Sequence, residues 1–398
     1  MKSVAIIGGG AAGCFCAVNL KRMAPQMEIT IYEAQSKLLA KVAITGGGRC
    51  NITNTFNNYK DAGGKITRLE EVYPRGNNLM KRLLMSFSNE DTLRWFEELG
   101  VRFTAQEDEC IFPKSQDAME IVGALQREIK RLGIEVVTGS KITDIDELKE
   151  DIKVVTAGGG KSLNFLSFLN NREIEIEPLH PSLFTFEIKE KELTQMSGTV
   201  VENVRCSIPT TRFKSFGPLL VTDWGLSGPA ILKLSSYGAV YLAENNYSAP
   251  LSVNWLGHDM DSVIKEIKSI TEQNPHKKLS SVAPKELTLR LWSYIIKRAG
   301  IREDIRCNEL GSKGLNKLAN TLFADSYSIT GKGKFKEEFV TAGGVSLNEV
   351  NSNTLRSKKY EDLYFAGEVL NIDAITGGFN LQAAWTTGYT VARAIASL

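Results

Sequence analysis

The chain begins with two short apolar runs separated by a stretch with helical periodicity. Residues 4–7 are apolar at consecutive positions, which is typical of a strand buried on both faces of a parallel sheet. Residues 14–23 have the pattern of a helix that stops before Pro25, and residues 28–32 predict a second strand that ends in Glu33. This strand–helix–strand order predicts the start of an α/β domain.

Three glycines follow the first predicted strand with the spacing G-x-G-x-x-G. Gly8 permits a tight turn, Gly10 lets the backbone approach a pyrophosphate, and Gly13 lets the helix pack close to the strand. The start of the helix, at Ala11 and Ala12, offers free N–H groups to phosphates. Together these features predict an adenine-dinucleotide site.

Glu33 stands twenty residues beyond the last glycine of this motif, where a carboxylate accepts hydrogen bonds from a ribose. An acid at this position argues against a 2′-phosphate, because two like charges would face each other. The ligand is therefore expected to lack that phosphate.

The stretch 41–54 distinguishes between NAD and FAD. A plain NAD domain would continue into another amphipathic helix, whereas this stretch places three consecutive glycines beside Arg, Asn and Thr side chains. Such a loop can bring backbone N–H groups and a guanidinium to a large anionic cofactor, which favours FAD. The cofactor contacts expected here are Lys41, Gly47, Gly48, Arg49, Cys50 and Asn51.

The C-terminal sixty residues contain similar segments, a strand that ends in an acid and a glycine-rich turn before a helix. The apolar run 340–345 is followed by a turn and a strand within residues 361–368, which ends in Gly367 and Glu368. A second glycine-rich turn, residues 376–380, then opens an amphipathic helix over 381–395. The N-terminus of that helix can stabilise negative charge on a reduced flavin.

The motifs GGGAAG at 8–13 and GGGRCNITN at 46–54 closely resemble those of the BaiN-like family of FAD-dependent flavoproteins, which includes aminoacetone oxidases. The resemblance implies that the Ala-Gly-Glu segment meets the ribityl–pyrophosphate part of FAD and that the GGFN turn lies beside the isoalloxazine. The contacts carried over in this way are Gly367, Glu368, Gly378, Phe379 and Asn380.

Residues 154–159 resemble a turn of glutathione-reductase-type flavoproteins, which implies further contacts from Ala157 and Gly158. The preceding stretch, 134–155, is too short for the extra β-meander usual in such proteins at this place.

Because both ends contribute to one FAD-binding sheet, the middle is predicted to be an insertion. Residues 1–178 and 341–398 would form a discontinuous Rossmann-like domain of glutathione-reductase type, in the α/β class. Residues 179–257 and 325–340 show short alternating runs and predict an inserted antiparallel β-rich substrate domain. Residues 258–324 have helical patterns and predict a small helical subdomain. Within the insertion, Asp223 stands where the resembling family commonly has His.

Composition narrows the class of protein further. Over 398 residues, 48 basic and 46 acidic side chains give a formal charge of +2, which argues against nucleic acid or a membrane as the main partner. Six cysteines without a CxxC pair favour a cytoplasmic protein without a disulfide framework. Cys50 lacks the nearby second cysteine of a redox dithiol, and three dispersed histidines predict no metal site.

No second G-x-G-x-x-G motif opens another strand–helix unit, so no separate NAD(P)-binding domain is expected. The working hypothesis is a FAD-dependent oxidoreductase in which a small organic substrate gives a hydride to flavin N5 and dioxygen reoxidises the flavin. The resemblance suggests an amine or amino ketone as that substrate. Arg49, Asn51 and Thr341 are the candidate polar groups around the ring and substrate, and no general base is identified.

Two alternatives remain open. One is an NAD(P)H-dependent flavoprotein that reduces an enone or a steroid-like substrate. The other is an FAD-binding regulatory or RNA-associated protein, against which the near-neutral charge argues.

Overall fold

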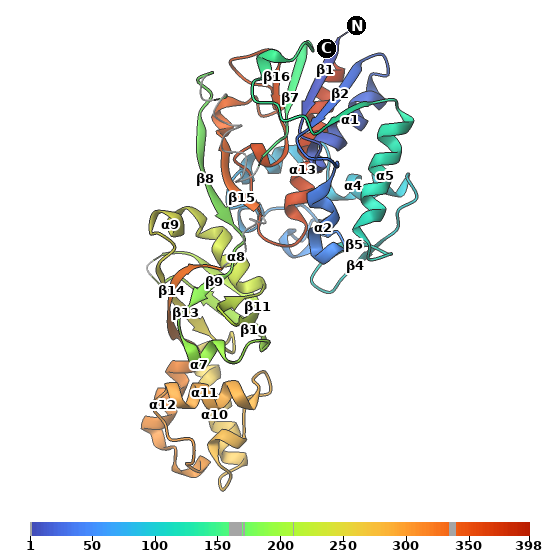
Figure 1. The fold of residues 1–398 in the computed structure, drawn as a ribbon. Coiled ribbons are helices and arrows are strands. Elements are labelled where there is room, and N and C mark those ends of the chain that lie inside the picture. The colour runs from blue at the N-terminus through green and yellow to red at the C-terminus, as the bar shows by residue number, and fades with distance from the viewer. Residues whose placement is uncertain (1, 159–168, 170–171, 210, 334–339) are drawn as a thin grey trace. The chain divides into compact units, whose positions relative to one another are not determined.

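The computed structural model describes residues 2–158, 169, 172–209, 211–333 and 340–398. The chain divides into two units, one formed by Met1–His180 with Val340–Leu398 and the other by Pro181–Phe339 (Figure 1). The first unit thus joins the two ends of the chain.

The first unit contains a parallel sheet, two smaller sheets and several helices. Its strands are β1 (Ser3–Ile7), β2 (Glu28–Glu33), β3 (Thr53–Asn54), β4 (Phe103–Ala105), β5 (Cys110–Pro113), β6 (Glu135–Thr138), β7 (Ile152–Val155), β8 (Ile176–Ser182), whose last two residues fall in the second unit, β15 (Val340–Val345) and β16 (Leu363–Phe365). Its helices are α1 (Ala11–Met23), α2 (Ala40–Gly48), α3 (Asn77–Leu83), α4 (Asn89–Glu97), α5 (Ala118–Arg131) and α13 (Phe379–Ala396).

The main sheet has the strand order β16-β7-β1-β2-β6, and every pair in it is parallel. The chain runs outward from β1 through β2 to β6 and then returns to the other side of β1 at β7. The order therefore reverses at β1, and in open parallel sheets the crevice at such a reversal, outside the carboxyl ends of the strands, is where ligands bind.

The connection from β6 to β7, residues 139–151, contains only one short 3₁₀ turn, η3 (Ile145–Glu147). The expected shortening of this region is therefore present.

Helix α1 packs against α5 and α13 and lies beside the sheet. Its buried face centres on Phe15, whose ring lies 4.6 Å from that of Trp95 and 5.3 Å from that of Trp385. These contacts join the first and the last helix of the chain in one core.

The second unit is built on a closed antiparallel barrel with the strand order β10-β11-β12-β9-β14-β13. The strands are β9 (Phe186–Ile188), β10 (Val200–Ser207), β11 (Lys214–Thr222), β12 (Gly225–Ser227), β13 (Ala249–Asn254) and β14 (Asp325–Lys332). The helices are α7 (Lys191–Thr194), α8 (Pro229–Tyr237), α9 (Ala239–Glu244), α10 (Met260–Gln273), α11 (Leu289–Arg298) and α12 (Gly311–Phe323).

One continuous apolar cluster contains both barrel residues, such as Val253 and Ile329, and helical residues, such as Ile267, Trp292 and Leu318. The barrel and the helices α10–α12 therefore share a core. The chain's return over residues 334–339 lies outside the described residues.

The predicted fold class is confirmed: a parallel α/β sheet is assembled from both ends, with an antiparallel β-domain and helices inserted. One local prediction was wrong, because residues 41–44 belong to helix α2 rather than to a loop. In the described part of the chain, no helix is both long and apolar enough to cross a bilayer. All six cysteines are free and buried.

Glu128 on α5 offers a test of how α1 and α5 are held together. Its carboxylate accepts from Arg131 Nε at 2.7 Å and from Arg22 Nε of α1 at 3.1 Å, and these bonds lower the pKa of Glu128 to about 2. We expect Glu128→Gln to lower the free energy of unfolding at pH 7 by about 1.5–3 kcal/mol, as for hydrogen bonds to charged groups.

A carboxylate whose pKa is depressed by folding stabilises the protein above its unfolded-state pKa and loses that contribution as pH falls toward the folded-state value. The difference between wild type and Glu128→Gln in urea unfolding should therefore be full at pH 7 and shrink from pH 5 toward pH 2. A pH-independent difference would contradict the assigned interaction.

Candidate cofactor site

The turn after β1 forms the centre of the site. Gly8 has φ +113°, and its N–H donates to Tyr32 O at 2.8 Å. A Cβ on Gly13 would lie 1.9 Å from the carbonyl oxygen of Gly8, so only glycine lets α1 approach β1 this closely.

Gly10 differs from its two neighbours in the motif. Its φ of −82° is open to any residue, and a Cβ built on it meets no protein atom within 4 Å. Gly10 precedes α1, whose first N–H groups, at Ala11, Ala12 and Gly13, have no intrahelical acceptor and donate to no other acceptor among the described residues. Open space in front of unpaired N–H groups at a positive helix end suits a phosphate group.

Glu33 ends β2 beside this helix start. Its Oε2 accepts from the Gly9 N–H at 2.7 Å, and its Oε1 accepts from the Gln35 N–H at 2.8 Å. Each carboxylate oxygen has a second lone pair, so the carboxylate is held in place while it can still accept from a ribose hydroxyl.

The GGGRCN segment follows the regular part of helix α2 and begins with a left-handed turn. Gly46, Gly47 and Gly48 have φ of 57°, 70° and 84°, and nothing lies within 4 Å of a Cβ built on Gly47 or Gly48. The free space at Gly47 and Gly48 would let an anion approach the backbone of this turn.

Arg49 and Cys50 follow this turn and differ in exposure. The exposed Arg49 guanidinium lies 4.4 Å from the centre of the Phe112 ring and donates to Gly46 O at 3.2 Å. Cys50 is fully buried, and that burial raises the pKa of its thiol to about 12. The Cys50 thiol therefore remains neutral near pH 7.

Lys41, Glu368 and Thr341 meet although they are far apart in sequence. Lys41 Nζ lies 3.0 Å from Glu368 Oε2, and Glu368 Oε1 accepts from the Thr341 N–H at 2.9 Å. Lys41 is 64 % exposed and Thr341 is buried in β15. The Lys41 charge is thereby held beside the strand end that carries Glu368.

Asn51 connects the GGGRCN segment to the C-terminal GGFN turn. With its amide oriented to satisfy both atoms, it donates to Thr53 O at 2.9 Å and accepts from the Gly378 N–H at 3.2 Å. Gly378 precedes α13 with φ +87°, and a Cβ on it would lie 2.4 Å from Thr53 O.

The next two residues of the turn point into the protein. The Phe379 ring is 2 % exposed and packs edge-on against Phe56 at 5.0 Å. Both atoms of the Asn380 amide bond the backbone of Ala374 at 2.9 Å. What these residues can present to a ligand is therefore the backbone at the start of α13.

Behind the segment 51–54 lies a buried polar network that the sequence analysis missed. Gln382 of α13 accepts from Thr53 Oγ1 at 2.7 Å and from Thr92 Oγ1 at 3.1 Å, and it donates to Thr386 Oγ1 at 2.9 Å. Likewise, Thr387 accepts from the Gly367 N–H at 2.9 Å. The available signal was the row of polar residues on the otherwise apolar face of the last helix.

The residues that follow β7 contact the end of β1 and the turn η8. The N–H groups of Thr156 and Ala157 both donate to Ile7 O at 2.9 Å. A Cβ on Gly158 would lie 2.5 Å from the Val369 N–H nitrogen, in the 3₁₀ turn η8 (Gly367–Val369). Gly159, the last residue of this expected segment, lies outside the described residues.

The residues present fit a dinucleotide with a pyrophosphate and a flavin ring that carries negative charge when it is reduced. The open space at Gly10, the helix start behind it and the held carboxylate of Glu33 suit a pyrophosphate and a ribose. The left-handed glycine turn and, from the C-terminal end of the chain, the start of α13 add positive potential. The Lys41 ammonium is paired with the Glu368 carboxylate.

Asp223 lies in the second unit, at the exposed turn between β11 and β12. It lines a cavity of about 360 Å³ with Trp224, Lys189 and Lys191, among others. Among the described residues, no cluster of His, Cys, Asp and Glu is arranged to hold a metal ion.

Comparison with known proteins gives matches over the whole chain. A family model described as the HI0933-like protein Rossmann domain matches residues 2–394. The 3-dehydro-bile acid delta(4,6)-reductase of Clostridium scindens is 26 % identical, over 100 % of this chain and 99 % of that protein. The ribosomal RNA dihydrouridine synthase of Haemophilus influenzae is also 26 % identical, over 98 % of this chain and 97 % of that protein.

Among solved structures, 3-ketosteroid delta1-dehydrogenase from Sterolibacterium denitrificans is similar, with a TM-score of 0.52 and full coverage of both chains. Its sequence identity is 12 %, so this likeness concerns the fold.

Gly10→Val tests the assigned position of the pyrophosphate. The open surroundings and ordinary φ of Gly10 should let the variant fold, while the branched side chain would occupy the space in front of α1. We expect the purified variant to retain about a tenth or less of the wild-type flavin, measured as absorbance near 450 nm per protein.

Gly13→Ala is the contrasting variant, because its Cβ would strike the Gly8 carbonyl and should lower the melting temperature itself. A yellow, fully loaded Gly10→Val protein would show that the pyrophosphate lies elsewhere.

Proposed function

Because the chain belongs to the HI0933-like family of Rossmann-domain proteins, we propose that it is a reductase that saturates a carbon–carbon double bond conjugated to a carbonyl group, with NAD(P)H as electron donor. The chain is a FAD-dependent oxidoreductase, as its sequence predicts. The direction of the reaction, the donor and the substrate class are the proposed part.

The single observation that supports this direction is the pair of full-length relatives. One is named as a reductase of a 3-dehydro-bile acid and the other as a synthase of dihydrouridine in ribosomal RNA. A 3-keto steroid with unsaturation at C4 and the uracil ring share one feature, a double bond conjugated to a carbonyl. Reduction of that bond is the chemistry common to both names.

When bound, FAD supplies two-electron hydride transfer: NAD(P)H is oxidised, the β-carbon of the double bond gains the hydride, and the α-carbon gains a proton from solvent. The protein's part is binding and orientation. We assign the pyrophosphate to Gly8, Gly10 and the N-terminus of α1, and the ribose to Glu33.

We assign the flavin side of the cofactor to residues of the two glycine turns and of the strand ends near them. The start of α13 and the turn at 46–48 would offer N–H groups and positive potential where a reduced flavin carries negative charge. Arg49, Asn51 and Thr341 remain the proposed neighbours of the ring and substrate. The other proposed contacts are Lys41, Cys50, Ala157, Gly158, Gly367, Glu368, Phe379 and Asn380.

The proposal places the enzyme in the cytoplasm, where reduced nicotinamide donors are available. Six free and buried cysteines are in keeping with a reducing compartment.

An anaerobic two-stage experiment tests the proposal. In the first stage, NADH or NADPH is mixed with the purified flavoprotein, and bleaching of the 450 nm band is expected within the time of a turnover. In the second stage, a dienone such as 1,4-androstadiene-3,17-dione or a uridine-containing RNA is added, and return of the band with formation of the saturated product is expected.

The small-amine oxidase expected from the resemblance gives the opposite result. In that case aminoacetone bleaches the flavin, NAD(P)H does not, and dioxygen is the acceptor that restores the band. Bleaching by no donor would overturn both and favour a non-catalytic role. Reoxidation by dioxygen alone, after bleaching by NAD(P)H, would contradict reduction of a double bond.

A further inference from the structure

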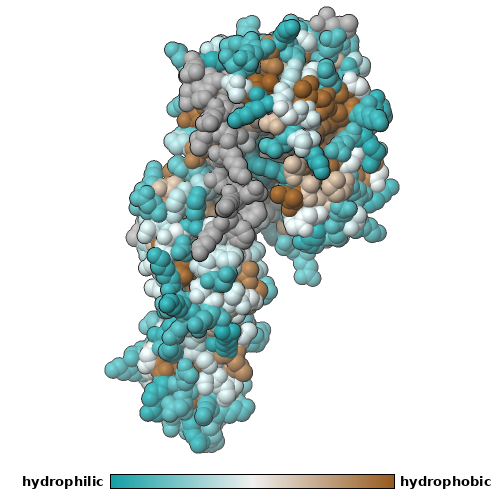
Figure 2. All heavy atoms as spheres, viewed as in Figure 1, coloured by the Kyte–Doolittle hydropathy of each residue, from teal (hydrophilic) through white to brown (hydrophobic). Residues whose placement is uncertain are grey.

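The near-neutral charge of the whole chain conceals a strongly basic segment. Residues 274–324 contain ten Lys and Arg and four Asp and Glu, a formal charge of +6. The remaining 347 residues carry −4. The segment covers the end of the helical region, and the visible face of that region is largely hydrophilic (Figure 2).

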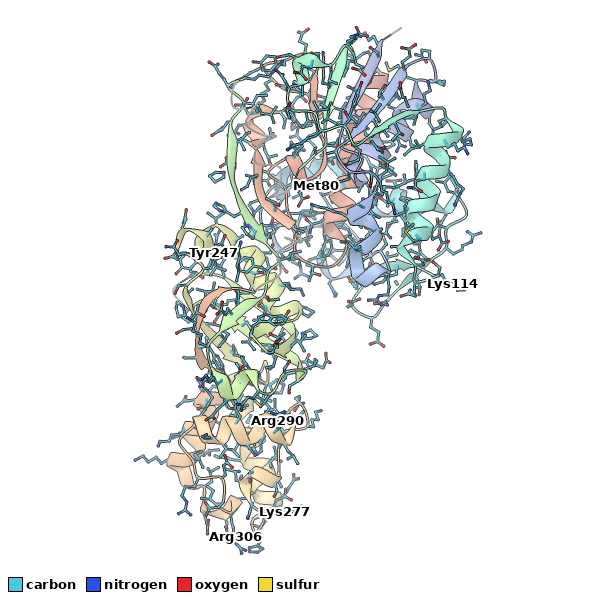
Figure 3. All side chains as sticks on the ribbon, viewed as in Figure 1. Met80, Lys114, Tyr247, Lys277, Arg290 and Arg306 are labelled. Atoms are coloured by element: carbon cyan, nitrogen blue, oxygen red, sulfur yellow. The ribbon has the colours of Figure 1, made fainter. Side chains whose placement is uncertain are left out.

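Two irregular stretches of the chain lie side by side and bring the first basic residues of this segment together. Leu279 N donates to Ile305 O at 2.9 Å and Cys307 N donates to Lys277 O at 3.0 Å, so residues 275–279 run beside 305–308. Lys278 and Arg306 face each other as an antiparallel bridge. Figure 3 shows Lys277 and Arg306 near each other at the end of the helical region.

Helix α12 adds two more basic residues. It begins at Gly311, directly after the 3₁₀ turn η6 (Cys307–Glu309), and it carries Lys313 on its first turn. Lys317 lies one turn further on the same side, about 6 Å along the helix axis. We call these exposed side chains the basic surface: Lys277, Lys278, Arg306, Lys313 and Lys317.

None of these five side chains forms an ion pair within the described part of the chain. Two acids of the segment pair with basic residues outside this surface, and a third, Glu309, bonds the backbone of Arg306. Glu286 pairs with Lys285 at 3.7 Å and Asp304 with Arg302 at 3.3 Å, while Glu309 accepts from the backbone N–H of Arg306 at 2.9 Å. The remaining acid is Glu303, and the exposed Glu272 precedes the segment on α10.

The composition of the surroundings indicates the kind of partner. A membrane-binding surface interleaves its basic residues with large apolar ones, but in residues 274–324 the only exposed large apolar side chain is Leu289, at the start of α11. The neighbours of the basic side chains are instead Ser280, Asn308, Ser312 and Asn316. Lys, Arg, Ser and Asn are the side chains that bond phosphate oxygens of nucleic acids.

We propose that the basic surface binds the phosphate backbone of a folded RNA. The charge of the surface, which no ion pair among the described residues neutralises, and its lack of large apolar side chains support this partner over a lipid surface. The inference goes beyond the proposed reduction, since a surface of this kind selects a polyanion by its backbone and leaves the choice of the reacting base to the flavin site.

Fluorescence anisotropy of a labelled, uridine-containing RNA stem-loop tests the proposal, with full-length flavoprotein titrated at several salt concentrations. The tested variant replaces all five residues of the basic surface by Gln. We expect its dissociation constant at 0.1 M salt to rise at least about tenfold, and the slope of log K against log[salt] to fall by about 3–4 units.

A charge-matched control replaces five exposed lysines of the first unit that form no ion pair among the described residues, and its affinity should stay within about threefold of wild type. These are Lys65, Lys81, Lys114, Lys130 and Lys149. A further variant keeps Arg306, whose guanidinium donates to His276 O, and replaces only the four lysines, so that any local unfolding is separated from loss of charge.

Equal weakening by the test and control variants would overturn the assignment of the surface, as would undetectable binding of RNA by wild type. Binding to phosphatidylserine vesicles in preference to RNA would replace the proposal with a membrane surface. Bleaching of the flavin by NAD(P)H is measured on the same variants and should be unchanged. The RNA result and the redox result can therefore fail independently of each other.

Discussion

The cofactor site depends on the close approach of helix α1 to strand β1. The Gly8 carbonyl occupies the space where any side chain at position 13 would begin. This approach aims the unpaired N–H groups of the first helical turn at the carboxyl edge of the sheet, beside the point where the strand order reverses. That packing contact sets the position of the positive helix end, while the Gly9 and Gln35 N–H groups hold the Glu33 carboxylate.

A second constraint is that the site is assembled from the two ends of the chain. Lys41 reaches Glu368, Asn51 reaches the Gly378 N–H, and Thr53 reaches Gln382, across more than 320 residues in each case. Two of these bonds reach the start of α13, which packs against α1, and the third reaches the 3₁₀ turn η8. The left-handed turn at 46–48 and the start of α13 therefore belong to one polar framework, supported from behind by fully paired and buried Thr and Gln side chains.

Positive potential arises in two different ways in the two units of the protein. Around the first unit's glycine turns, positive potential comes mainly from helix ends and backbone N–H groups, which act at short range on a small anion. In the helical part of the second unit, it comes from the exposed Lys and Arg of the basic surface, which form no ion pair among the described residues, act at longer range and are weakened by salt. A balance of +2 over the whole chain describes neither region.

Local sequence alone determined the fold class, the FAD fingerprint and family, and the elements β1, α1, β2 and α13, because glycine spacing and apolar periodicity are properties of neighbouring residues. It failed at residues 41–44, where a short helix precedes the glycines, because the pattern was too brief to distinguish helix from loop. Tertiary structure decided that Phe379 and Asn380 turn inward, that Gln382 bonds Thr53, and that Lys278 pairs with Arg306 in a β-bridge. Such pairings depend on which distant segments meet, and no local pattern encodes them.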